Sequence, residues 1–241
     1  MHKVVSNHTM ENNNLNNKEN KMSPIKFLRR YWHDIGLVSA IVAGIYLMFT
    51  WSSLVLLQKL LILNFIVVLL HQFEEYSWPG GFPAVANMVL FSSPKPDRYR
   101  LNQNSSMVAN LIFAYVFYLL PVFFPNVIWL GLATVFNGIF QFFGHAVYVN
   151  IRLRSFYSPG VATNVFGWLT IGVIYIQHIL VNNLVDSRDW LLGIVWMVVF
   201  YFLNFILIEQ ILLGDKNSPY PFDPDEMKRG GVAKRFESIS R

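Results

Sequence analysis

The sequence contains no cysteine and few charged residues. Only 14% of its 241 residues are Asp, Glu, Lys or Arg, whereas 54% are hydrophobic and 16% are aromatic. The absence of cysteine excludes a disulfide, a thiolate metal ligand and a cysteine nucleophile. Because ordinary soluble domains carry about 25% charged residues, a chain so poor in charge is expected to be an integral membrane protein.

Several catalytic and transport patterns are also missing. The sequence has no HExxH motif, and His71 precedes Glu74, so it lacks the Glu-x-x-His pairs of di-iron bundles. It has no internal repeat and no related pair of broken spans, which many secondary transporters have. The net charge of +5 comes from basic residues in loops and tails, as membrane orientation requires, and we expect no nucleic-acid partner.

Long apolar runs predict an all-α fold, a polytopic transmembrane helical bundle of six spans. Their approximate ranges are 35–53, 56–76, 107–124, 127–149, 161–185 and 190–213. Residues 1–34 are polar and are predicted to form a disordered cytoplasmic tail. Residues 214–241 form a charged tail, predicted to be mostly unstructured. The apolar stretch 82–91 is too short to cross and is expected to be interfacial or re-entrant.

Lysine and arginine are distributed unequally between the two sides that six spans create. One side receives 17 of the 19, in the two tails and in the loops around Lys95 and Arg152, while the other side keeps Lys59 and Arg188. The positive-inside rule therefore predicts that both termini are cytoplasmic. The expected protein is a multi-pass membrane protein whose partner is the lipid bilayer, and the sequence indicates no oligomeric state.

Three ionisable residues lie together at the end of the second predicted span. His71, Glu74 and Glu75 have the spacings i, i+3 and i+4, which place them on one face of a helix. An ionisable group within a span costs several kcal/mol and is a functional-site hypothesis by default. The fourth and sixth spans run in the same direction as the second, so His145 and Glu209 are predicted at a similar, cytoplasm-facing depth.

Two histidines and two or three carboxylates can bind zinc, iron or manganese without sulfur. The candidate ligands of a divalent metal are His71, Glu74, Glu75, His145 and Glu209. In a metal-dependent hydrolase, one of the adjacent glutamates would be a general base on a water activated by the ion. The sequence does not show which glutamate is the ligand and which is the base.

Further elements follow this cluster in order. After His71–Glu75 come Trp78–Phe82, then His145, then Tyr157–Gly160. Over about residues 55–185 the chain resembles the HXXEE family of membrane proteins. The resemblance implies that His71, Glu74 and Glu75 form the motif, that His145 is the second histidine, and that Tyr157, Pro159 and Gly160 form a Tyr-x-Pro-Gly element. It implies a site and supplies no reaction.

The leading interpretation is a metal-dependent hydrolase acting on a lipid or another membrane-borne substrate. In this interpretation Tyr157 is a catalytic candidate that donates a phenolic hydrogen bond to a substrate or a carboxylate, although its loop could also be only a turn that starts the next helix. One alternative is a small transporter or a proton or cation relay that uses the same acids. A second is a non-catalytic assembly protein whose polar cluster fixes helix packing.

Reporter fusions test the predicted orientation. A reporter joined after Gly214 should lie in the cytoplasm, and reporters near Pro125 or Ser187 should lie outside, because these loops follow odd numbers of spans. The measurement is the paired activity of alkaline phosphatase and green fluorescent protein fusions. A cytoplasmic signal at Pro125 would contradict the orientation. It would also remove the argument that the His71–Glu75 motif, His145 and Glu209 share one depth.

Overall fold

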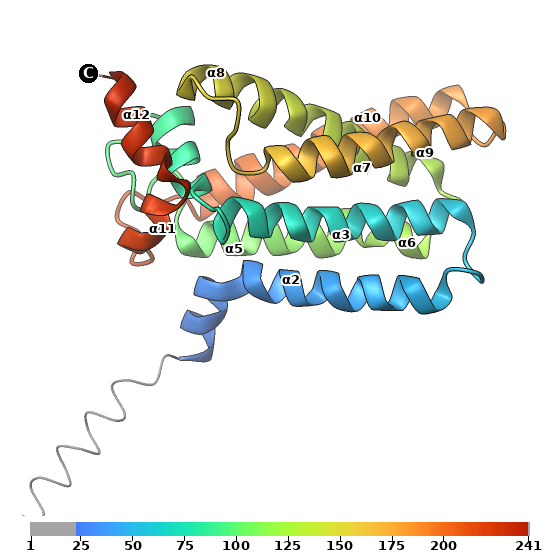
Figure 1. Ribbon diagram of the computed structural model, residues 1–241, viewed down its shortest axis with the longest axis horizontal. Coiled ribbons are helices and arrows are strands. Elements are labelled where there is room, and N and C mark those ends of the chain that lie inside the picture. Colours follow the sequence, from blue (N-terminus) through green and yellow to red (C-terminus); the bar gives the residue numbers. More distant parts are fainter. Residues whose placement is uncertain (1–22, 241) are drawn as a thin grey trace, which may run out of the picture. The chain divides into compact units, whose positions relative to one another are not determined.

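The computed structural model describes residues 23–240, and every regular element in that range is a helix (Figure 1). The predicted disorder of residues 1–22 lies outside the described residues. Six helical stretches are long and apolar enough to cross a membrane: Pro24–Thr50, Leu56–Tyr76, Gln103–Phe123, Ile128–Leu153, Thr163–Val181 and Ser187–Leu212. The all-α class and the six spans are confirmed.

Some spans are single helices and others combine α-helical with wider π-helical segments. The first two are α2 (Pro24–Thr50) and α3 (Leu56–Tyr76). The third joins α5 (Gln103–Ile112), η2 (Phe113–Tyr118) and α6 (Leu120–Phe123). The fourth joins α7 (Ile128–Phe142), η3 (Phe143–Val149) and α8 (Asn150–Leu153). The fifth joins η4 (Thr163–Leu169) to α9 (Thr170–Val181), and the sixth joins α10 (Ser187–Tyr201) to η5 (Phe202–Leu212).

The first helix begins at Pro24, so the prediction of a disordered tail up to residue 34 is wrong for its last part. Proline fits the first turn of a helix, and apolar residues then alternate with basic ones in a pattern that a helix accommodates. The chain divides into two units after Trp32, and the structure describes the first unit from residue 23 onward. The described part of the first unit is the beginning of α2, which kinks at Tyr31.

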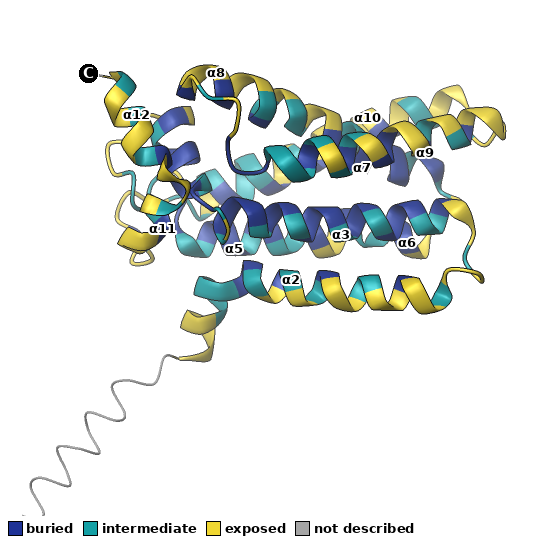
Figure 2. Ribbon diagram, in the orientation of Figure 1, coloured by how far each residue is buried: buried dark blue, intermediate teal, exposed yellow. Residues whose placement is uncertain are grey.

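In the second unit, α3 lies at the centre of the helical bundle. It packs against η2, α6, η4 and α9, and most of its surface is buried (Figure 2). By contrast, α10 exposes many apolar side chains, as a helix facing lipid does. The residues at the end of α3 therefore lie inside the bundle.

Small residues and buried hydrogen bonds hold the spans close together. A Cβ atom added at Gly138 of α7 would lie 2.9 Å from Cβ of Trp168 in η4, so the two helices approach closely at this glycine. Asn64 of α3 donates a hydrogen bond from Nδ2 to Oγ1 of Thr134 in α7, at 2.7 Å. The core of the bundle is thus tied by both packing and polar contacts.

The prediction of a mostly unstructured C-terminal tail is also wrong. It contains α11 (Pro224–Lys228) and α12 (Val232–Ser240). A capping box between Asp223 and Glu226 starts α11. Val232 of α12 packs on the short helical stretch α4–η1, residues 82–90, which buries the apolar segment predicted as interfacial or re-entrant. Its place relative to a bilayer stays a prediction.

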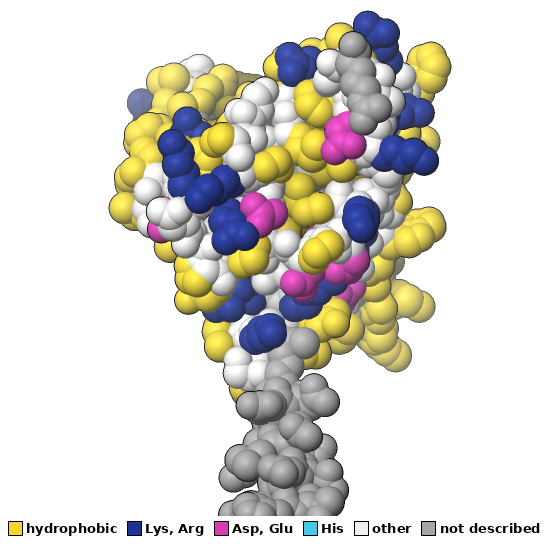
Figure 3. Space-filling view, turned by 90° about the vertical axis from the view of Figure 1, so that its left-hand side faces the viewer, with side chains coloured by type: hydrophobic (Ala, Val, Ile, Leu, Met, Phe, Trp, Pro, Cys, Tyr) yellow, Lys and Arg dark blue, Asp and Glu magenta, His cyan; other side chains and the backbone are white. Residues whose placement is uncertain are grey.

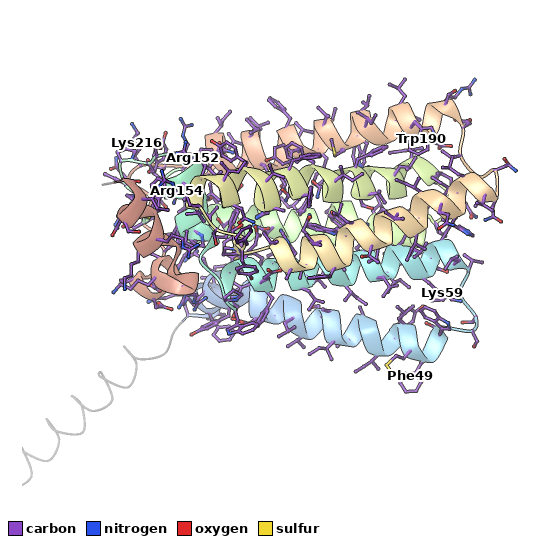
Figure 4. All side chains as sticks on the ribbon, turned by 45° about the horizontal axis from the view of Figure 1, so that its top comes forward. Phe49, Lys59, Arg152, Arg154, Trp190 and Lys216 are labelled. Atoms are coloured by element: carbon purple, nitrogen blue, oxygen red, sulfur yellow. The ribbon has the colours of Figure 1, made fainter. Side chains whose placement is uncertain are left out.

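Charged side chains gather at one end of the second unit. Arg152, Arg154 and Lys216 lie at that end, whereas Lys59 and Trp190 lie at the other (Figure 4). Figure 3 shows the end that carries Arg152 and Lys216, with lysine and arginine side chains distributed over its face. Lysine and arginine are thus distributed unequally between the two ends, as the positive-inside rule assumes. The cytoplasmic location of the termini stays a prediction.

Two glycines of the fourth span test the close approach of α7 to η4. We expect Gly138→Ala to lower the free energy of unfolding by about 1–3 kcal/mol, because its methyl group would overpack against Trp168. Gly144→Ala should be neutral or stabilising by up to about 1 kcal/mol, because alanine favours helix and its Cβ would meet no described atom within 4 Å. Thermal unfolding followed by circular dichroism measures both. Equal effects would contradict the close approach.

Candidate functional site

The end of α3 places the His-x-x-Glu-Glu motif inside the bundle. His71, Glu74 and Glu75 lie in its last turns and are 2%, 6% and 4% exposed. The helix stops after Tyr76, and the chain turns at Gly80 and Gly81, whose φ angles of 71° and 105° favour glycine. The turn keeps the motif at the very end of a buried helix.

His71, Glu75 and His145 bring three possible ligand atoms together. Nε2 of His71 lies 3.5 Å from Oε1 of Glu75, and Nε2 of His145 lies 3.2 Å from the same oxygen. All three ligand atoms lie within 4.8 Å of one another, and all three residues are buried. His145 comes from η3, so the second and fourth spans contribute jointly, as their predicted depth requires.

The second nitrogen of each histidine has a fixed partner. Nδ1 of His145 lies 2.9 Å from the carbonyl oxygen of Pro159, which only accepts, so Nδ1 carries the hydrogen. Nδ1 of His71 lies 2.9 Å from Oγ1 of Thr163. The hydroxyl of Thr163 donates to Oε2 of Glu74 at 2.6 Å, so it accepts from His71. With Nδ1 as the donor in each ring, a neutral imidazole directs its Nε2 lone pair toward Glu75.

Three acceptor atoms that face one another need either a shared proton or a metal cation between them to be stable. Ligands about 2.0–2.1 Å from a tetrahedral zinc ion are about 3.3–3.4 Å apart. The separations of 3.5 Å and 3.2 Å to Oε1 of Glu75 fall on either side of that value. The group formed by His71, Glu75 and His145 could therefore hold a metal ion.

Glu74 faces a different neighbour from Glu75. Its Oε1 accepts hydrogen bonds from the hydroxyl of Tyr157 at 2.7 Å and from the amide of Ala162 at 3.0 Å. Its Oε2 accepts from the amide of Thr163 at 2.8 Å as well as from the hydroxyl of that residue. These four bonds use the lone pairs of both oxygens. Glu74 thus caps the start of the fifth span, where free amide groups attract an anion.

The loop from Tyr157 to Gly160 covers the two histidines. Burial, followed by the hydrogen bond to Glu74 and its charge, raises the pKa of Tyr157 above the ordinary value, so the phenol remains a donor. A Cβ atom at Gly160 would lie 2.6 Å from Cε1 of His71 and 3.1 Å from Cε1 of His145. Gly160 also has a φ of 94°. Only glycine allows the loop to lie against both rings.

A cavity of about 180 Å³ lies beside the three ligand atoms. His71, Glu75 and His145 form part of its wall, and Glu209 of η5 lines it as well. Glu209 is 4% exposed, and its Oε1 has no hydrogen-bond partner within residues 23–240. Most of the remaining wall is apolar, and the side chains that form it are Phe82, Ala86, Leu90, Phe91, Leu101, Phe113, Phe140, Val149 and Phe205.

The predicted site residues thus occupy three different places. His71, Glu75 and His145 converge, Glu209 lies on the shared cavity, and Glu74 is directed at the loop that contains Tyr157. Sequence reasoning missed Thr163, which links His71 to Glu74. The available signal was a hydroxyl residue shortly after Pro159-Gly160, where the free amides at the start of a helix favour such side chains.

Fold and site together define a helical protein with six candidate membrane spans and a buried group of two histidines and one glutamate. Residues 62–175 match the family described as "Protein of unknown function with HXXEE motif". This is the HXXEE family that the motif predicts, and the matched segment contains the three converging residues and the loop over them. Searches among curated proteins and among solved structures find no match to the chain.

The contact between Gly160 and the two histidines can be tested against a second glycine. We expect Gly160→Ala to lower the free energy of unfolding by at least about 2 kcal/mol, through backbone strain and through collision with His71. Gly231 also has a positive φ, 66°, but a Cβ there would meet no described atom within 4 Å. Gly231→Ala therefore isolates the strain. A thermal shift no larger for Gly160→Ala than for Gly231→Ala would contradict the contact.

Proposed function

We propose that this chain is a membrane-embedded, metal-dependent hydrolase with a cytoplasm-facing site. In this proposal His71, Glu75 and His145 bind one divalent ion. The observation that supports it most directly is the convergence of three acceptor atoms whose orientation is fixed from behind by Pro159 and Thr163. Such supporting hydrogen bonds are typical of histidines that bind metals.

Among zinc, iron and manganese, zinc is the ion that we propose. Catalytic zinc is held by three protein ligands, two histidines and a glutamate among the known sets, with the fourth position open. An octahedral ion with bonds of about 2.1 Å would place adjacent ligands about 3.0 Å apart, closer than either separation from Glu75. The cavity adjoins the ligand atoms and offers space for a fourth ligand.

The three glutamates have separate roles in this proposal. An ion held by the group would lower the pKa of a water molecule and polarise a carbonyl group. Glu209 would accept a proton from the attacking water as the water oxygen bonds to the carbonyl carbon, and would return it to the leaving group as the carbon–oxygen or carbon–nitrogen bond breaks. Glu75 is a ligand. Glu74, whose lone pairs are all used, is a positioning residue, and so is Tyr157.

Metal content tests the ligand set. We expect about one zinc ion per chain in purified protein after loading, and at least about tenfold weaker retention for His71→Ala, Glu75→Gln and His145→Ala, because the remaining two ligands bind poorly. His178→Ala is the matched control, because His178 bonds Asn182 elsewhere on the fifth span. The measurement is elemental analysis during titration with a chelator.

Turnover separates the hydrolase from its alternatives. Glu209→Gln should keep the metal and lose hydrolysis of a panel of fluorogenic fatty-acyl esters, whereas the three ligand variants should lose both. Wild-type protein that retains no zinc, iron or manganese would contradict the proposal and favour a proton relay or a packing role. Metal binding without any hydrolysis in the panel would leave the metal site and reject the hydrolase for these substrates.

A further inference from the structure

The cavity beside the ligand group lies where the fourth and sixth spans separate. The helices α7 and α10 pack closely along their length, whereas their continuations η3 and η5 have little contact. Phe140 and Tyr201 mark the point of separation, with ring centroids 5.2 Å apart. Beyond this pair the cavity wall is shared between the two spans, with Gly144 on one side and Phe205 on the other.

Gly144 lines this cavity, and the space beside its Cα is empty. A Cβ atom added there would meet no described atom within 4 Å. The side chains that flank it outward are apolar and exposed, including Phe143 and Val147 on η3 and Phe202 on η5. Since these helices are candidate membrane spans, exposed apolar side chains at this level face hydrocarbon. An opening at Gly144 would therefore face the bilayer interior.

A second cavity, on the water-facing side of the loop, does not reach the ligand group. It is lined by Tyr157, Pro159 and Arg235 among others, and it shares no lining residue with the first. The loop itself, with Ser158 and Gly160 buried, lies between it and the histidines. This second cavity therefore provides no continuous route to the ligand atoms.

Size and wall chemistry restrict what can enter. An engineered cavity of about 150 Å³ holds one benzene molecule, so 180 Å³ has room for a polar group and a few methylenes. A whole phospholipid does not fit. A peptide would need partners for its backbone groups. The amide side chains of the wall are Gln72, Asn110, Gln141 and Gln210, and Gln72 already donates to the carbonyl of Asn110.

We infer that the site takes acyl lipids, esters or amides of a fatty acid, laterally from the bilayer through the opening at Gly144. The carbonyl end enters first and reaches His71, Glu75 and His145, while most of the hydrocarbon chain stays in the membrane between the fourth and sixth spans. This inference rests on the proposed function for the chemistry of the carbonyl end. The lateral route itself depends only on the opening and its apolar walls.

Photolabelling tests the route with a palmitic acid analogue that carries a diazirine near its carboxyl group, using the full chain in phosphatidylcholine vesicles. In wild-type protein the label should map to the cavity wall in the fourth and sixth spans. Gly144→Leu should lower that labelling about tenfold, because the new side chain fills the opening. Gly44→Leu is the matched control. Gly44 is also a helical glycine where an added Cβ would meet no described atom within 4 Å, and it lies in the first span, which does not line the cavity.

Metal content, measured on the same samples, separates this inference from the proposed function. Wild-type levels of metal in Gly144→Leu with reduced labelling support the lateral route. Unchanged labelling in Gly144→Leu, or wild-type labelling outside the cavity wall, overturns it even if metal is bound. If the wild-type protein binds no metal and Gly144→Leu still lowers the labelling, the result supports the route and contradicts the hydrolase. Gly144→Met, with a flexible side chain, replaces Gly144→Leu if that variant does not fold.

Discussion

The hydrogen bonds that Glu74 accepts from the start of the fifth span determine the arrangement of the whole site. A carboxylate inside a bundle attracts amide and hydroxyl donors strongly, because little water competes for them. Its bonds to Ala162 and Thr163 fix where the fifth span begins. The chain that enters this span must then pass over the histidines, and it presents the carbonyl of Pro159 to His145. The position of one carboxylate thus sets the environment of its neighbours.

Adjacent glutamates can serve different neighbours because successive residues on an α-helix point about 100° apart. Glu75 is one turn from His71 and shares its face toward His145. Glu74 is directed at the loop between the fourth and fifth spans. Both acids are buried in the most buried span of the bundle, where an unpaired charge costs several kcal/mol. The two glutamates of the motif therefore make different contacts on two faces of one helix. Neither carboxylate is placed to make the contacts of the other.

The sequence was sufficient for the spans and for the shared level of His71 and His145, because hydrocarbon length and chain direction alone fix depth. It could not assign the two glutamates, since the direction of a helix face depends on the neighbours that tertiary packing supplies. The C-terminal helix α12 was missed for a related reason. Its apolar residues are few, and Val232 is buried only because the stretch 82–90 lies against it. Depth predicts which residues share a level, and packing decides which of them touch.

The two histidines take their orienting partners from a single stretch of chain. Pro159 and Thr163 are separated by three residues, and Gly160 between them touches both rings. The two imidazoles are consequently not independent parts of the site, because any displacement of this stretch rotates or releases both. The changes in the free energy of unfolding caused by substitutions at His71 and at His145 should therefore not add. A substitution in the loop should affect both histidines at once. The two imidazoles are therefore thermodynamically coupled, because the position of one loop determines the orientation of both.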